Sequence, residues 1–386
     1  MNISNILIAL DSFKGSGSSK ELGSYTKQGV LEILPNANIK VIEIADGGEG
    51  TLDAIMSKKK GDTIELNAHD LLGELIPARF GLLDGEIAII EAAQTIGLTL
   101  RKANKVCALK GSSFGVGEQI IQALDYGAKH IFIGLGGTAT NDGGMGMARA
   151  LGVEFFDKLG NPVEEGLVGL KDIAKIDLEK LDPRIKNTTF TILSDVENPL
   201  VGKTGAIYFF GEQKGLDINQ LDKYDEWMSS YGGILEIEFS FNKKESIGAG
   251  AAGGLGAALQ TFCQAQHKNG IEEILKLIDF EENVKQADLI FTGEGRMDEQ
   301  SLFGKAPVGI GRIAKKYNKP VIALVGGKNG KLDSIYNQGI SCVLPIVTQP
   351  MTLEKAIENT KAGVIETTKT VLRCIDIGFL MEKSNS

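Results

Sequence analysis

The sequence has few of the residues from which metal and redox sites are commonly built. Its 386 residues include only four cysteines and three histidines. No two cysteines form a C-x-x-C pair, and His69, His130 and His267 do not stand at metal-ligand spacing. We therefore expect neither a zinc site nor a histidine-based catalytic triad. Acid–base chemistry would instead fall to aspartate, glutamate and lysine side chains.

The sequence also lacks long apolar runs, an excess of basic charge and a signal-peptide pattern. No apolar run reaches the ~18 residues that a membrane span needs, and the opening residues MNISN do not have signal-peptide character. The formal net charge is -9, whereas nucleic-acid binding usually needs a basic surface. We expect a cytoplasmic protein whose partner is a small molecule, with no membrane and no nucleic acid. The length is enough for two domains of ordinary size.

Glycine, by contrast, is abundant, with 49 residues against a typical ~7% of a chain. The densest stretch, GLGGTATNDGGMGMARALG over 134–152, follows the apolar run 130–133 and ends in a helix-like segment from Met145. A backbone with few side chains can turn its N–H groups onto an anion, and a helix N-terminus adds partial positive charge. Asn141 and Asp142 could offer oxygens there to a metal ion or a hydroxyl. The stretch matches neither a Walker A nor a dinucleotide pattern, so it predicts a phosphate loop on physical grounds alone.

Strands and helices alternate at both ends of the chain. Expected strands cover residues 5–10, 39–45, 288–292, 320–325 and 341–346, and expected helices cover 18–34, 50–59, 305–317, 332–338 and 353–372. The alternation predicts an α/β fold: a Rossmann-like parallel-sheet domain formed by both chain ends, with an inserted second α/β domain. We place the first domain at 1–60 plus 284–386 and the inserted domain at 61–283, with a ligand cleft between them.

The middle of the chain is less regular. Expected strands there cover 63–66, 87–91, 131–134, 190–193 and 206–210. The segment 260–276 and the closing helix are interpreted as core-facing amphipathic helices. The closing helix could pack on its own sheet or on a second subunit of a homo-oligomer.

Four loops that combine glycine with charge follow strands of the first domain. They are DSFKGS at 11–16, DGGEGT at 46–51, TGEGRMD at 292–298 and GGK at 326–328. In a parallel sheet the carboxyl ends of the strands lie along one edge, where open α/β sheets bind ligands. Any one loop could be a tight turn with a helix cap, but together they predict a shared site.

Three further segments of the inserted domain have competing interpretations. Asp195 follows an apolar run and could be a site carboxylate or the start of an Asx turn before Pro199. The GAGAAG of 248–253 matches G-x-G-x-x-G, but the polar residues before it are not strand-like, so a dinucleotide site is disfavoured. The GKT of 202–204 lacks the upstream glycine of a Walker A loop, because Glu197 stands in its place.

Six sequence blocks occur in order between residue 6 and about residue 361: DSFKGS, ADGGEGT, GLGGTATNDGG, SDxxNPL, GAGAAGG and TGEGRxD followed by GKAP. With these blocks the sequence resembles the bacterial glycerate kinase family of the two-domain α/β type. The resemblance implies a kinase, with an alcohol group as acceptor, that uses ATP and Mg²⁺ to phosphorylate D-glycerate. It favours 2-phosphoglycerate over 3-phosphoglycerate as product. Thr138 stands where many relatives carry serine, and either hydroxyl serves.

Residue roles follow from placing that chemistry on the loops. For the nucleotide we expect Gly136, Gly137, Thr138, Asn141 and Gly143; for the substrate Asp11, Ser12, Asp46, Gly47 and Arg296; and for the metal Asp142 or Asp195. Asp195 is also the candidate base, and Lys14 would neutralise charge on the transferred phosphoryl group. Arg296 would hold the glycerate carboxylate by two parallel hydrogen bonds.

Three alternatives remain open from the sequence. The first is an NAD-dependent oxidoreductase that uses the G-x-G-x-x-G match, and the second is a ligand-binding protein without catalysis. The third is a kinase for a different small hydroxy acid, which would need the same phosphate loop and carboxylate clamp. The sequence does not distinguish the phosphorylated hydroxyl, the oligomeric state or the metabolic pathway.

Overall fold

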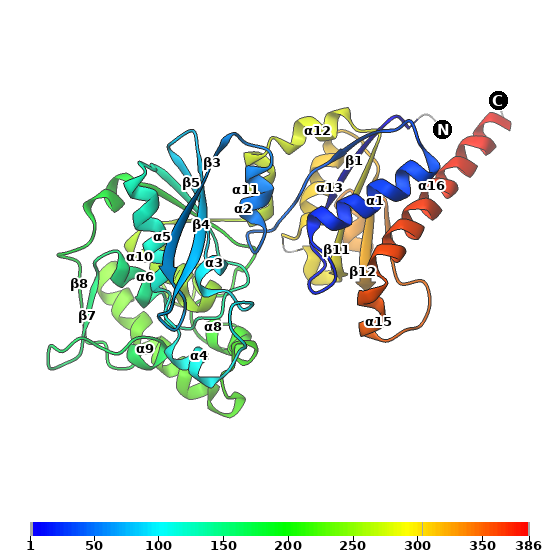
Figure 1. Ribbon diagram of the computed structural model, residues 1–386. Helices are drawn as coiled ribbons and strands as arrows, with labels where there is room; N and C mark the ends of the chain where they lie inside the picture. Colours follow the sequence, from blue (N-terminus) through cyan, green and yellow to red (C-terminus); the bar gives the residue numbers. More distant parts are fainter. Residues whose placement is uncertain (1–2, 303, 385–386) are drawn as a thin grey trace. The chain divides into compact units, whose positions relative to one another are not determined.

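The structure is a computed structural model that describes residues 3–302 and 304–384. Its contacts divide the chain into two compact units (Figure 1). Unit 1 comprises Met1–Asp46, Asp53–Ser57 and Ile271–Ser386, and unit 2 comprises Gly47–Leu52 and Lys58–Gly270. Both units are layered from helices and a largely parallel sheet, so the expected α/β class is confirmed. No helix in the described ranges is both long and apolar enough to cross a membrane.

Unit 1 contains a five-stranded, wholly parallel sheet in the order β13-β12-β11-β1-β2. The strands are β1 (Asn5–Leu10), β2 (Asn38–Val41), β11 (Leu289–Met297), β12 (Val321–Lys328) and β13 (Cys342–Pro345). Ile6 of β1 lies opposite Leu289 of β11, so segments from the two ends of the chain are neighbours at the centre of the sheet. Their apolar side chains are buried, which is typical of parallel strands covered on both faces.

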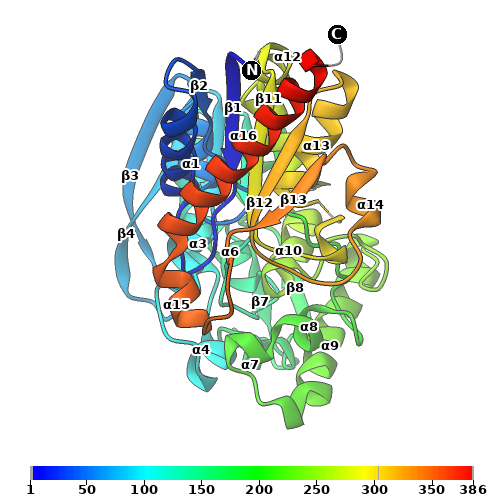
Figure 2. The same ribbon diagram turned by 90° about the vertical axis from the view of Figure 1, so that its right-hand side faces the viewer.

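Helices cover both faces of this sheet. In Figures 1 and 2, α1 (Ser19–Ile33) and α16 (Thr360–Ser384) lie together on one face, with α12 (Phe280–Gln286) and α13 (Ala306–Lys316) on the other. A capping box of Ser18 and Glu21 begins α1. A Cβ at Gly29 would lie 2.8 Å from the Ile365 carbonyl oxygen, so glycine lets α1 and α16 approach closely. The remaining helices are α2 (Thr51–Met56), α11 (Gly270–Leu277), α14 (Asp333–Tyr336), α15 (Leu353–Glu358) and the 3₁₀ turn η5 (Glu299–Leu302).

Unit 2 contains a six-stranded sheet in the order β10-β9-β6-β5-β4-β3. Its strands are β3 (Gly61–His69), β4 (Leu75–Leu83), β5 (Ile87–Glu91), β6 (His130–Gly134), β9 (Thr189–Leu193) and β10 (Gln266–Lys268). Strands β5, β6, β9 and β10 are parallel, whereas β3, β4 and β5 form an antiparallel meander. A separate antiparallel pair joins β7 (Glu154–Phe156) and β8 (Lys175–Asp177).

The helices of unit 2 bury one large apolar core against this sheet. They are α3 (Ala93–Ile96), α4 (Lys105–Lys110), α5 (Phe114–Asp125), α6 (Met145–Ala150), α7 (Leu167–Leu170), α8 (Ala206–Phe210), α9 (Leu221–Phe239) and α10 (Leu255–Phe262), with 3₁₀ turns η1 (Pro183–Asn187), η2 (Glu212–Lys214), η3 (Ile218–Gln220) and η4 (Ala251–Gly254).

Four expectations about local structure are wrong. Residues 206–210 form helix α8, not a strand, because a short buried apolar run has no periodicity that separates the two. The segment 260–276 contains β10, and the closing helix is divided into α15 and α16. The glycines of TGEGRM and GGK lie within β11 and β12, which pair with each other as far as Met297 and Lys328.

Candidate functional site

The carboxylates of Asp11, Asp46 and Glu294 interact electrostatically at the carboxyl end of β1 in unit 1. Asp11 directly follows β1, its backbone N–H donates to the Gly293 carbonyl (3.0 Å), and its Oδ1 accepts from the Ser12 N–H (2.7 Å). Burial, then the charges of Asp46 and Glu294, raise the pKa of Asp11 well above its ordinary value. The bond from Ser12 works in the opposite direction. The structure therefore brings Asp11, Ser12 and Asp46, three of the expected substrate residues, into one electrostatic neighbourhood.

Glu294 is a member of this neighbourhood that the sequence analysis did not single out. It is 4% exposed within β11, and Lys305 Nζ lies 2.8 Å from its Oε2. Burial raises the pKa of Glu294, and Lys305 acts against that shift. Lys305 also donates to the Arg296 carbonyl (3.3 Å). Strand alternation through TGEGRM could have indicated that Glu294 and Arg296 share a face.

Lys14 and Arg296 are exposed cations at this edge of the sheet. The Arg296 side chain is 67% exposed, and its Nε lies 3.4 Å from the Asp298 carboxylate. An exposed ion pair of this kind is weak, so the guanidinium can exchange partners at low cost. Lys14 is exposed in the loop after β1, and its charge lowers the pKa of Asp11. Both cations stand where an anionic ligand could reach them.

The glycine-rich loop 134–144 of unit 2 connects β6 to α6, as the sequence predicts. Gly137 and Gly143 have φ angles of +74° and +63°, which glycine adopts without strain. The Gly136 N–H donates to the Gly47 carbonyl (3.1 Å). A Cβ at Gly134 would lie 2.6 Å from the Gly47 carbonyl oxygen, so the start of this loop packs closely on the backbone of Gly47.

A neighbouring segment of the chain holds the other side of the glycine-rich loop. Thr138 is buried and forms an isolated antiparallel bridge with Gly97. The Leu98 N–H donates to the Gly137 carbonyl (2.8 Å). The segment 97–104 therefore acts as a backbone support for the turn at Gly137–Thr138.

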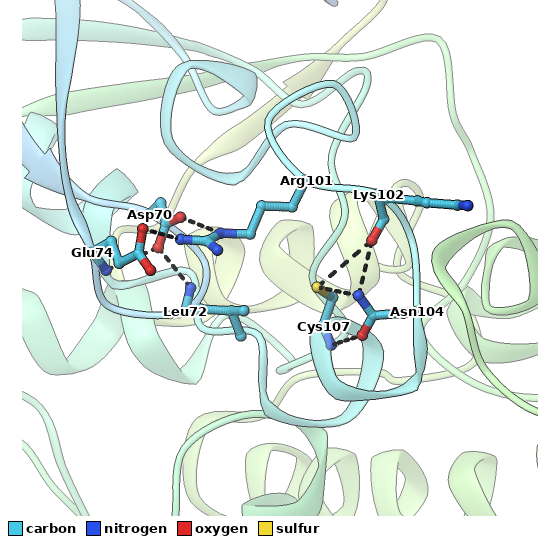
Figure 3. A network of polar contacts seen from close by, with 7 residues as sticks. All are labelled: Asp70, Leu72, Glu74, Arg101, Lys102, Asn104 and Cys107. Carbon is cyan, nitrogen blue, oxygen red and sulfur yellow. Dashed lines mark hydrogen bonds and ion pairs between the residues drawn. The ribbon is translucent and has the colours of Figure 1, made fainter.

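A polar network fixes that supporting segment (Figure 3). Arg101 Nε donates to buried Asp70 (2.5 Å), and the same guanidinium pairs with Glu74 (2.6 Å). Burial alone would raise the pKa of Asp70, but its hydrogen bonds from Glu74 and Arg101 outweigh burial and lower it. Asn104 caps α4 through the backbone N–H of Cys107 (3.0 Å), and its amide also approaches Cys107 Sγ (3.3 Å). The sequence analysis did not find the ion pairs of Arg101, because Asp70 and Glu74 lie in a different segment of the chain.

Asp142 has a structural place within the loop, in contrast to the expected metal role. It is fully buried, and its carboxylate accepts from the Ser113 N–H (2.8 Å), the Ser113 hydroxyl (2.7 Å), the Gly146 N–H (3.0 Å) and the Gly144 N–H (3.2 Å). Ser113 Oγ accepts from the Met147 N–H (2.9 Å). Asp142 and Ser113 thus cap α6, and the helix N-terminus expected to face an anion has its first N–H groups engaged internally.

Asn141 is also committed to the fold of the loop. It is fully buried, and its Nδ2 donates to the Ala108 carbonyl (3.2 Å) at the end of α4. The amide nitrogen of Asn141 is engaged in this bond, whereas its Oδ1 is buried and has no hydrogen-bond partner among the described residues.

Asp195 is half-buried in the loop after β9. The turn there is made by Ser194, whose Oγ accepts from the Val196 N–H (3.1 Å), while His267 Nε2 bonds to the Val196 carbonyl (3.1 Å). Ser194 thus forms a serine turn next to Asp195. Asp195 is left at the carboxyl end of a parallel strand, the usual position of a ligand-binding carboxylate.

The backbone of the G-x-G-x-x-G segment, residues 248–253, forms hydrogen bonds to the glycine-rich loop and to the loop after β9. The Gly253 carbonyl accepts from the Gly143 N–H (3.0 Å), and the Gly250 N–H donates to the Asn198 carbonyl (2.9 Å). A Cβ at Gly253 would lie 2.0 Å from the Thr140 carbonyl oxygen. In the described part of the chain, α9 and a loop lead directly into the segment in place of a strand, so the dinucleotide interpretation lacks its required context.

No group of three His, Cys, Asp or Glu side chains within residues 3–302 and 304–384 could hold a metal ion. Mg²⁺ usually takes one or two carboxylates together with substrate phosphates, and this donor set does suit the carboxylates described above.

Comparisons with known proteins agree along nearly the whole sequence. The model of the glycerate kinase family matches residues 6–376. The glycerate 2-kinase of Escherichia coli is 39% identical over 97% of this chain and 98% of its own length, and a glycerate kinase of Halalkalibacterium halodurans is 40% identical over 92% and 94%. A crystal structure from Salmonella typhimurium LT2 that bears the glycerate kinase 2 designation superposes with a TM-score of 0.82, at 38% identity, over 98% of this chain and 100% of that one. The chain belongs to the glycerate kinase family, a group of phosphotransferases with an alcohol group as acceptor.

Proposed function

We propose that this protein transfers the γ-phosphoryl group of ATP to the 2-hydroxyl of D-glycerate, giving 2-phosphoglycerate, with Mg²⁺ as the metal ion. The observation that carries the proposal is the full-length similarity to the family, including the E. coli protein whose name specifies a 2-kinase. Phosphoryl transfer needs positioning and charge neutralisation more than covalent chemistry, and both units offer suitable loops.

The triphosphate is assigned to the turn at Gly136–Thr138. Positive φ at Gly137 and the absence of bulky side chains give the backbone room to approach phosphate oxygens. The supports at Gly47 and Gly97 would keep this turn in place without a ligand, which reduces the entropy lost on binding. Gly143 and Asn141 then shape the far end of the loop.

Asp195 is assigned to Mg²⁺ in preference to Asp142. Asp195 is half-buried at a strand end, whereas four hydrogen bonds already occupy the buried carboxylate of Asp142. A bound Mg²⁺ would supply neutralisation of the phosphate charge.

The carboxylate group of unit 1 is assigned to glycerate. Asp46 and Ser12 would bind its hydroxyls, and Arg296 would hold its carboxylate. We move the role of base from Asp195 to Asp11, because a raised pKa makes a carboxylate a better proton acceptor near neutral pH. Lys14 would balance the charge of the transferred group.

Phosphorus NMR of the protein with Mg-ATP and D-glycerate tests the proposal. A 2-phosphoglycerate signal that disappears on addition of EDTA supports it. A 3-phosphoglycerate signal would overturn the regiochemistry, and no phosphoglycerate from a folded sample would overturn the substrate.

The role of Lys14 has its own variant and control. Lys14→Ala should lower kcat more than threefold. Lys20→Ala, at an exposed position of α1, should leave kcat unchanged. A loss smaller than threefold, or under ~0.7 kcal/mol of transition-state stabilisation, would refute its role.

A further inference from the structure

Lys214 is a buried lysine directly against the glycine-rich loop. It ends η2, is 3% exposed, and its Nζ donates to the Thr140 carbonyl (2.8 Å). The next residue, Gly215, has φ +103°, and a Cβ there would lie 2.6 Å from the Asn104 backbone. The backbone of Lys214 is therefore held against the α4 cap while its side chain reaches the loop.

The surroundings of Lys214 show why its hydrogen bond matters to the glycine-rich loop at Thr140–Asn141. Two other oxygens of the turn, Thr140 Oγ1 and Asn141 Oδ1, are buried and accept no hydrogen bond from the described residues. Donors are therefore scarce, and the bond from Lys214 anchors the Thr140 carbonyl. A buried carbonyl that loses its donor is costly, since it can neither bond to water nor find another partner.

The charge of Asp142 also reaches Lys214. Burial lowers the pKa of Lys214 to about 7, and the Asp142 carboxylate acts to raise it. From α9, the ring of Tyr231 lies beneath Gly143, where an added Cβ would be 2.7 Å from Cε1. Burial, then the charge of Asp142, raises the pKa of Tyr231. Burial also raises the pKa of Asp142, and its hydrogen bonds from Ser113, Gly146 and Gly144 act against that shift.

We propose that Lys214 is a positioning residue for nucleotide binding: its side chain fixes the Thr140 carbonyl and thereby the backbone of the phosphate loop. The inference rests on the proposed function only in assigning ATP to that loop. A methionine would fill the same space without the desolvation cost of an ammonium group, so volume alone does not account for a lysine. The ammonium contributes through its hydrogen bond and its charge.

The test compares Lys214→Met with Lys243→Met. Lys243 is a matched control, because it is also largely buried in unit 2 (17% exposed), donates to the Ser229 carbonyl (3.3 Å) and pairs with Glu236 (3.2 Å), and neither bond involves the loop. Both variants should lower the melting temperature. Only Lys214→Met should raise KM for ATP, by about tenfold, the factor that 1.4 kcal/mol produces. KM for glycerate should change less than that for ATP.

A second readout does not depend on activity. Amide hydrogen exchange of the ligand-free protein should become faster across residues 138–143 in Lys214→Met and stay unchanged there in Lys243→Met. Lys214→Gln keeps a donor but removes the charge, so it serves if the methionine variant does not fold, and it should give an intermediate exchange rate.

Two results would overturn the inference. If exchange in the loop and KM for ATP match the wild type while stability falls, Lys214 is structural only. If the wild type does not phosphorylate glycerate, the proposed function fails, yet hydrogen exchange still decides whether Lys214 positions the loop.

Discussion

Replacing Gly253 with alanine tests whether the glycine segment really supports the phosphate loop. Gly253 has φ +67°, a conformation that costs an L-residue about 1–2 kcal/mol. The new Cβ would also lie 2.0 Å from the Thr140 carbonyl oxygen, a backbone atom that cannot rotate away. Relieving such overlap typically costs about 1–3 kcal/mol more. We therefore expect a total destabilisation of about 2–5 kcal/mol.

Gly160→Ala provides the matched control. Gly160 also lies in unit 2 and has φ +84°, but an added Cβ there would meet no atom within 4 Å. It should show only the conformational cost of about 1–2 kcal/mol. In a domain of this size, each kcal/mol lowers the melting temperature by roughly 2–4 °C, so calorimetry can separate the two variants.

Kinetics complete the comparison. Because Thr140 belongs to the phosphate loop, Gly253→Ala should also raise KM for ATP, and Gly160→Ala should not. The reasoning is refuted if Gly253→Ala is no more destabilising than Gly160→Ala, or if it leaves KM for ATP unchanged.

Two further predictions concern the carboxylates of unit 1. Burial and the charges of Asp46 and Glu294 raise the pKa of Asp11 in the folded state above its unfolded value. Protonated Asp11 therefore contributes to the free energy of unfolding at low pH, and this contribution is lost as the pH rises through the raised pKa. Asp11→Asn should therefore melt at a higher temperature than the wild type at pH 7, and the difference should become smaller toward pH 4. Its kcat should be much lower. Equal melting temperatures at pH 7 would contradict the upward shift of the Asp11 pKa. Lys305→Met removes the partner of buried Glu294 and should cost about 3 kcal/mol in urea unfolding at pH 7. Adding Glu294→Gln to Lys305→Met should recover part of the lost free energy of unfolding. No recovery would mean that the Lys305–Glu294 ion pair does not stabilise this part of unit 1.

The class of fold could be predicted from the sequence because its signals are local. Apolar runs of strand length alternate with amphipathic segments, and Ser18 and Pro35 mark the ends of α1 by their own chemistry. The loops after β1 and β6 were found in the same way, since glycine directly after an apolar run is a local pattern.

The parts that could not be predicted depend on contacts between distant segments. The glycines of TGEGRM look like a turn, but a Cβ at Gly293 would lie 2.1 Å from the Leu324 carbonyl oxygen of the neighbouring strand. Their purpose is close strand pairing, which no local pattern reveals. The tie between Asp142 and Ser113 and the bond from Lys214 to Thr140 also join residues far apart in sequence. From the sequence, the carboxylate of Asp142 could bind a metal or cap a helix. Only its hydrogen-bond partners in the fold distinguish these two roles.

The central pairing of β1 with β11 has a consequence for synthesis of the protein. β1 ends at Leu10 and β11 begins at Leu289, so at about 5–20 residues per second the ribosome makes β11 roughly 15–60 s after β1. All strands of unit 2 emerge during that interval. For most of that time β2 and α1 are available to the apolar segment of β1, while its other neighbour strand, β11, is not. The time needed to synthesise residues 11–288 therefore sets how long the apolar face of β1 stays without its central partner strand.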